Sequence, residues 1–103
     1  MSYILIKDYP STMLNGEDWG HCRLYLDIGS DGYPIRQMEF HSNGKKLSYS
    51  KTHVEDEFSV LSDACLDLEK HVFQGLEFVC IEEFDFEVLW NTASFDNSSK
   101  SAD

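Results

Sequence analysis

The chain has little of what marks a secreted or membrane protein. No apolar run approaches the roughly 20 residues that a membrane-spanning helix needs. Residues 1–8 show neither a basic start nor a small-residue cleavage motif, so no signal peptide is expected. The three cysteines, Cys22, Cys65 and Cys80, are odd in number and far apart, which makes a poor disulfide framework. We therefore expect a cytoplasmic protein with no membrane partner.

Motifs for metal, cofactor or catalytic chemistry are also missing. The sequence contains no Cys-x-x-Cys pair and no two histidines spaced at i, i+4, so the usual spacing of zinc ligands is absent. Residues 29–32 are glycine-rich but fall in a predicted hairpin, not between a strand and a helix as a phosphate loop would. The sequence predicts no metal, no cofactor and no catalytic residue. One alternative stays open, a small enzyme that uses His41 or His53 with a nearby carboxylate.

Basic residues are scarce in the second half of the chain. Residues 1–53 hold six acids and six bases, whereas residues 54–103 hold thirteen acids against Lys70 and Lys100 alone. The second half therefore carries the whole net charge of −11. Such a charge opposes binding to nucleic acid or to an anionic membrane, and it suits either a cationic partner or an ordinary solvated surface.

The chain does have the material for a packed core. Its 103 residues are 42% hydrophobic and include seven Phe, five Tyr and two Trp, which argues for one folded domain rather than disorder. We place that domain at residues 1–93. Residues 94–103 are rich in Ser, Asn and Asp, and we expect them to form a disordered tail.

Alternating residues predict an antiparallel meander between residues 21 and 51. In residues 22–28 the apolar side chains recur at every second position, which indicates a half-buried strand. Residues 35–41 form the return strand, with a bulge near Arg36 because Ile35 is out of phase with Met38. Asn43-Gly44 is a strong hairpin signal leading into a strand at 45–51. Residues 3–9 and 76–81 also have strand character.

Two later segments have helical patterns. Leu61, Cys65, Leu68 and Val72 fall at i, i+4, i+7 and i+11, so we predict a helix that Ser62 caps and Gly75 ends. Residues 82–93 fit a strand or a helix, and the acids at their start favour the helix. The predicted fold is α+β, an antiparallel sheet of about four or five strands with two helices.

The acids of the second half form two clumps that also contain phenylalanine. An anionic field speeds encounter with a cationic protein, and exposed aromatic residues supply binding energy after encounter. The alternative is that these acids are only solvated surface. The residues predicted to face a partner are Glu55, Asp56, Glu57, Phe58, Glu82, Glu83, Phe84, Asp85 and Glu87.

Short motifs support a resemblance. The segments that carry it are Leu24-Tyr25-Leu26-Asp27, Asp31-Gly32, Arg36-Gln37-Met38-Glu39-Phe40, Asn43-Gly44, Ile81, Phe86-Glu87 and Trp90. They look like small bacterial domains, and with its size and acidity the chain resembles the immunity proteins of contact-dependent and polymorphic toxin systems. The resemblance implies a cytoplasmic, non-enzymatic protein that covers the active site of a cognate toxin domain, which we expect to be a basic nuclease. A DNA mimic that occupies nucleic-acid-binding proteins is the other alternative.

Overall fold

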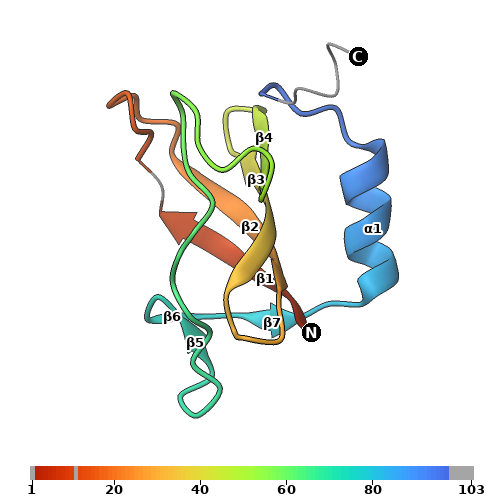
Figure 1. Cartoon of the computed structure of the whole chain (residues 1–103). Helices are drawn as coiled ribbons and strands as arrows, with labels where there is room; N and C mark the ends of the chain where they lie inside the picture. Colours follow the sequence, from red (N-terminus) through yellow and green to blue (C-terminus); the bar gives the residue numbers. More distant parts are fainter. Residues whose placement is uncertain (1, 11, 98–103) are drawn as a thin grey trace.

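The fold is α+β, a five-stranded antiparallel sheet with one helix. The computed structural model describes residues 2–10 and 12–97. Within them the sheet has the order β4-β3-β2-β1-β7, and a separate two-stranded hairpin pairs β5 with β6 (Figure 1). The bounds are β1 Ser2–Pro10, β2 His21–Ile28, β3 Pro34–His41, β4 Lys46–Ser50, β5 Val72–Phe73, β6 Leu76–Glu77, β7 Val79–Cys80 and α1 Glu83–Thr92.

The meander predicted from alternation is confirmed. Strands β2, β3 and β4 pair in sequence order, and β1 joins the outer side of β2. The predicted bulge is also present. Asp27 pairs with Arg36 while the next residue, Ile28, pairs with Pro34, so Ile35 is the extra residue on β3. The strand predicted over 76–81 is divided between β6 and β7.

The helix predicted over 62–75 is wrong. Residues 61–66 run without regular structure, and their amides bond to distant groups: Ser62 N–H donates to Gln37 Oε1 at 2.9 Å and Leu66 N–H donates to the Gly32 carbonyl at 2.9 Å. These contacts replace the i−4 bonds of a helix. The predicted apolar stripe is dispersed accordingly, because Leu68 is 74% exposed whereas Phe73, outside the stripe, is fully buried in β5.

The helix predicted over 82–93 is confirmed as α1. Its inner side buries Phe86, and Glu83 and Asp85 lie in its first turn, where carboxylates interact favourably with the helix dipole. Among the described residues, no helix is long and apolar enough to cross a membrane.

Both faces of the sheet are covered, so the core has two layers. Figure 1 shows α1 on one side of the sheet and the long segment after β4 on the other. Successive residues of a strand point to opposite faces, which explains how β3 serves both layers. The layer under α1 contains Tyr3, Met38, Phe86, Leu89 and Trp90. The layer under the long segment contains Ile4, Ile6, Leu24, Leu26, Leu47, Tyr49, Leu61 and Phe73.

The segment after α1 returns to the edge strand β4. Asp96 N–H donates to the Lys46 carbonyl at 2.7 Å, and the Asp96 carboxylate accepts from Lys46 N–H at 2.8 Å. The Asn97 side-chain amide both donates to and accepts from the backbone of Ser48, at 3.0 and 2.9 Å. The disordered tail predicted for 94–103 stays a prediction for residues 98–103, which lie outside the described residues.

Candidate functional site

The outer side of α1 exposes two apolar side chains. Phe84 is 75% exposed and Val88 is 41% exposed. They stand at i and i+4 and therefore lie on the same side of the helix. Glu82, Glu83 and Asp85, next to Phe84 in sequence, are also exposed. We call these five residues the α1 patch, an apolar centre with carboxylates beside it.

The remaining acid of this segment, Glu87, points inward. Its carboxylate accepts two hydrogen bonds from the Arg36 guanidinium, one of them 3.1 Å long. The Arg36 bond lowers the pKa of Glu87. Arg36 also donates to Asp27 at 2.8 Å and lies over the rings of Phe86 and Trp90, 4.9 and 5.2 Å from their centroids. This cation joins the helix to the sheet, and the Glu87 side chain, which is 35% exposed, is held in that contact. Its role as a partner-facing charge stays a prediction.

The other acidic clump, at residues 55–58, differs because the Asp56 carboxylate accepts several hydrogen bonds from within the structure. Burial by itself raises the pKa of Asp56, but hydrogen bonds to the carboxylate outweigh burial and hold the pKa at about 2. The five groups that bond the two oxygens are Tyr49 Oη, His53 Nε2, Asn97 Nδ2, Phe58 N and Ser59 N, at distances from 2.7 to 3.2 Å. Asp56 therefore closes the 53–59 turn onto β4.

Phe58 is likewise drawn inward. Its ring packs against Trp19 with the centroids 5.1 Å apart, in the cluster that contains Met13 and Leu61. Glu55 and Glu57 stay exposed. This clump covers the sheet face that carries Leu47, whereas α1 covers the other face. The structure thus places the sheet between the two acidic clumps and does not bring them together.

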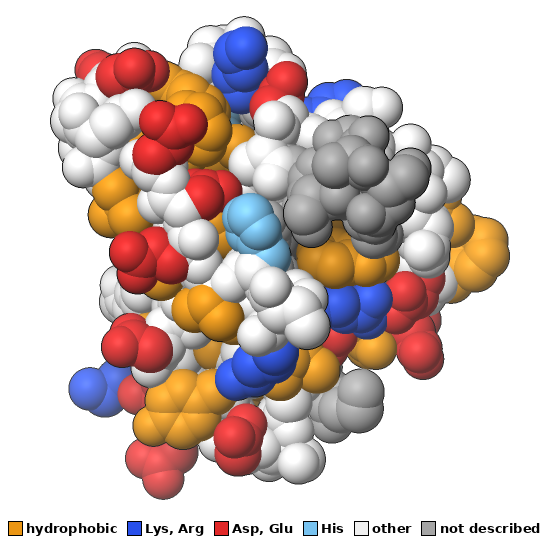
Figure 2. Space-filling view, turned by 45° about the horizontal axis from the view of Figure 1, so that its top comes forward, with side chains coloured by type: hydrophobic (Ala, Val, Ile, Leu, Met, Phe, Trp, Pro, Cys, Tyr) orange, Lys and Arg blue, Asp and Glu red, His pale blue; other side chains and the backbone are white. Residues whose placement is uncertain are grey.

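The surface reflects this separation. On the face shown in Figure 2, many Asp and Glu side chains lie along the left edge, and others lie at the right edge. The right-hand group lies on the side where Figure 1 places α1.

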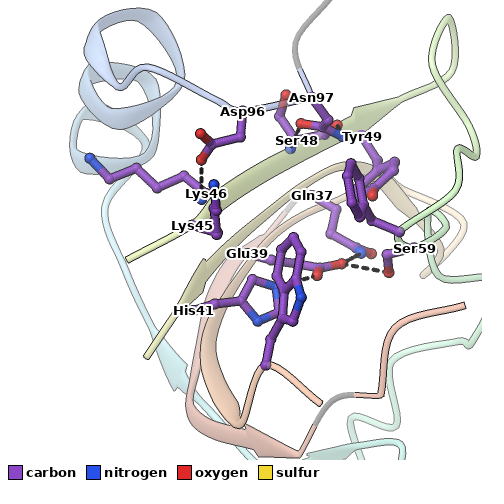
Figure 3. A network of polar contacts seen from close by, with 12 residues as sticks. Gln37, Glu39, His41, Lys45, Lys46, Ser48, Tyr49, Ser59, Asp96 and Asn97 are labelled. Atoms are coloured by element: carbon purple, nitrogen blue, oxygen red, sulfur yellow. Dashed lines mark hydrogen bonds and ion pairs between the residues drawn. The ribbon is translucent and has the colours of Figure 1, made fainter. Parts of the chain in front are cut away.

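A polar network lies inside the core layer under the long segment after β4. In it His41 has the carboxylate neighbour that the enzyme alternative requires, whereas the sequence did not suggest the other members. Glu39 receives hydrogen bonds from Gln37 Nε2 at 2.7 Å and from Ser59 Oγ at 2.9 Å, and its other oxygen lies 2.9 Å from His41 Nε2. Figure 3 shows Glu39 between these three side chains. The His41 side chain is 0% exposed and that of Glu39 4%. The edge of Trp19 meets the His41 ring, with the centroids 5.1 Å apart.

Cys22 completes this buried group. It is the direct cross-strand partner of His41, and Glu39 is on the same face of β3 two residues earlier. Donor atoms of Cys22, Glu39 and His41 all lie within 4.8 Å of one another. His21, the chain neighbour of Cys22, is exposed, as the alternation of strand residues predicts. The signal that could have found the group is the pairing register of β2 and β3.

The two histidines of the enzyme alternative each have a carboxylate partner, Glu39 for His41 and Asp56 for His53. His41 is shielded from solvent beside Glu39. His53 is partly exposed, but its partner Asp56 is already engaged by four other donors. A cleft of about 440 Å³ reaches Gln37, Glu39 and Ser59 from the surface. Another, of about 660 Å³, lies between β1 and the β5–β6 hairpin.

Comparison with models of known protein families, with curated proteins and with solved structures finds no match to the chain. The resemblance to immunity proteins therefore stays a prediction.

Proposed function

We propose that this protein is an inhibitor of the immunity type, which binds a cationic toxin domain through the α1 patch and covers its active site. The observation that supports this proposal is the exposure of Phe84 and Val88 among carboxylates. The acids alone have a sufficient structural explanation, because carboxylates stabilise the first turn of a helix. Phe84 has no such explanation, since the core side of α1 is already filled by Phe86, Leu89 and Trp90.

The chemistry of the patch suits a basic protein surface. Carboxylates of Glu82, Glu83 and Asp85 stand in for substrate phosphates and steer a cationic partner. Phe84 then supplies a desolvated aromatic contact of the kind that carries most of the binding energy in protein interfaces. Nuclease domains have the required basic surface, because they must bind phosphates. The protein acts by occupancy and performs no reaction.

The first test identifies the partner and locates its contact on the chain. Chemical cross-linking followed by mass spectrometry on the captured complex should yield one stoichiometric basic protein, cross-linked near α1. Adding the purified inhibitor should abolish the nuclease activity of that protein. Capture of many DNA-binding proteins would instead support the DNA mimic, and a partner whose activity is unaffected would overturn the proposal.

Matched variants then separate the α1 patch from the general charge. Neutralising Glu82, Glu83 and Asp85 to the corresponding amides should slow association at least tenfold, and the wild-type affinity should fall steeply with salt. The control neutralises Glu55, Glu57 and Glu69, which are also exposed acids but lie outside α1, and it should change association little. Equal effects of the two variants, or an affinity independent of salt, would contradict the proposed surface.

A second matched pair tests the aromatic contact. Phe84→Ala should weaken binding by roughly 30-fold or more, a loss typical of a central interface residue. Leu68→Ala is the control, because Leu68 is 74% exposed and lies in the turn before β5. An unchanged affinity of Phe84→Ala would remove Phe84 from the interface.

A further inference from the structure

The cluster of Cys22, Glu39 and His41 contains three different metal-ligand types in a layer that is otherwise largely apolar. A thiolate, an imidazole and a carboxylate are the three side-chain ligands of zinc in proteins. Burial of a carboxylate beside a histidine is unfavourable unless its charge is compensated. A divalent cation compensates a thiolate and a carboxylate together. From this arrangement we infer that Cys22, Glu39 and His41 bind a Zn²⁺ ion.

The distances are close to those that the ion requires. Zinc bonds of about 2.0–2.3 Å in a tetrahedron set the ligand atoms roughly 3.5 Å apart. The donor atoms of the cluster all lie within 4.8 Å of one another, and the contact between His41 and Glu39 is 2.9 Å long. Side-chain shifts of about 1 Å therefore complete the geometry, and the β2–β3 pairing of Cys22 with His41 holds the backbone in place.

The surroundings of Glu39 resemble the outer shell of a metal site. Ligating carboxylates in proteins are themselves held by hydrogen bonds from neighbouring groups. Here Gln37 and Ser59 both donate to Oε2 of Glu39, so that Oε1 faces His41. Gln37 is in turn fixed by the Ser62 amide and the Val60 carbonyl. The 440 Å³ cleft, which Glu39 lines, gives the carboxylate side of the cluster access to the surface. Three protein ligands leave the fourth position of a tetrahedral zinc ion for a water molecule.

The alternative is a structural ion pair between Glu39 and His41 with no metal. The double variant Cys65→Ser/Cys80→Ser distinguishes the two, because it replaces two exposed cysteines and keeps Cys22 as the only thiol. This protein is reduced, stripped with a chelator and titrated with Co²⁺, which substitutes for zinc and gives a thiolate-to-metal charge-transfer band. We expect one Co²⁺ per chain with that band, displaced by Zn²⁺.

The histidine is tested in the same protein, without a core substitution. On addition of Zn²⁺ the ring resonances of one of the four histidines should shift, and those of the exposed His21 and His71 should not. Removing the thiolate with Cys22→Ser in the double variant should eliminate the band and lower the affinity more than about 100-fold. Absence of the band in the double variant, or an unshifted set of histidine resonances, would establish the ion pair and overturn the metal site.

Discussion

Segments 55–58 and 82–87 are alike in sequence and opposite in structure. The first has three acids followed by Phe58, and the second has four acids with Phe84 and Phe86 among them. In the first, Asp56 and Phe58 turn inward and close a turn over the sheet. In the second, Phe84 stays in solvent and Phe86 is buried under the helix, while Glu87 is the acid that contacts Arg36. The same sequence pattern, acids with an aromatic residue, can therefore either fasten a loop to the sheet (a staple, as in 55–58) or form an exposed surface, as in 82–87.

The physical origin of the difference is the local backbone. In a tight turn, the amides of Phe58 and Ser59 donate hydrogen bonds to the carboxylate two or three residues earlier. The Asp56 carboxylate is therefore bonded within its own loop. A helix satisfies its own amides beyond the first turn and projects its side chains outward around the axis. Acids on a helix therefore remain available unless a basic side chain of the sheet captures them.

The largest loss of stability should follow removal of the contact between Arg36 and Glu87 on α1. Arg36→Met removes the cation shared by Glu87 and Asp27, and Asp27 is 1% exposed with Oδ1 unpaired in the described structure. Leaving that carboxylate buried without a cation should lower the free energy of unfolding by about 4 kcal/mol. Urea denaturation measures the change. Arg23→Met, at an exposed position, is the control and should stay within about 0.5 kcal/mol.

A smaller loss of stability, seen only at acidic pH, should distinguish Asp56 from the acids of the α1 patch. The pKa of Asp56 is about 2 in the folded protein and lies near its ordinary value of 3.8 in the unfolded chain. The hydrogen-bonded carboxylate therefore contributes about 2 kcal/mol, fully present above pH 4 and lost as the pH falls towards 2. Asp56→Asn should lack this part of the acid-induced loss, as unfolding titrations between pH 5 and pH 2 would show.

Asp85→Asn is the matched variant for that measurement. Asp85 is exposed and contributes only through the helix dipole, so its profile should follow the wild type within about 0.5 kcal/mol. If Asp56→Asn and Asp85→Asn had the same pH profile, the distinction between staple and free surface would not hold.

The smallest effect concerns the two phenylalanines. Phe58→Ala removes a half-buried ring from the contact with Trp19 and should lower stability by about 1.5 kcal/mol, less than a fully buried Phe would. Phe84→Ala should change stability by less than about 0.5 kcal/mol, because its ring is in solvent. Thermal and urea unfolding check both. A Phe84 variant as destabilised as the Phe58 variant would mean that Phe84 packs against the fold.

The sequence predicted the parts of the fold that follow from local patterns. Alternation in residues 22–28, the Asn43-Gly44 turn and the phase of Ile35 were enough for the meander and its bulge. The acids at the start of α1 were enough to choose helix over strand. Each of these depends on residues within one turn or one hairpin.

The predictions from sequence failed where the structure depends on contacts between residues far apart in the chain. The stripe of Leu61, Cys65, Leu68 and Val72 had helical spacing. However, Gln37 on β3 and Gly32 in the β2–β3 loop accept hydrogen bonds from the amides of Ser62 and Leu66. The buried group of Cys22, Glu39 and His41 was missed for a related reason. Polar residues on a strand suggest a solvated face, and only the β2–β3 register reveals that this face meets Leu24 and Leu26.

Asp96 and Asn97, which border β4, affect whether copies of the protein can associate through the edge of the sheet. An open strand edge has unpaired backbone N–H and C=O groups, which can form hydrogen bonds with an edge strand of another copy of the same protein. Asp96 and Asn97 use the amide and carbonyl groups of Lys46 and Ser48 on that edge. This short segment therefore acts as a guard against ribbon-like self-association of the sheet.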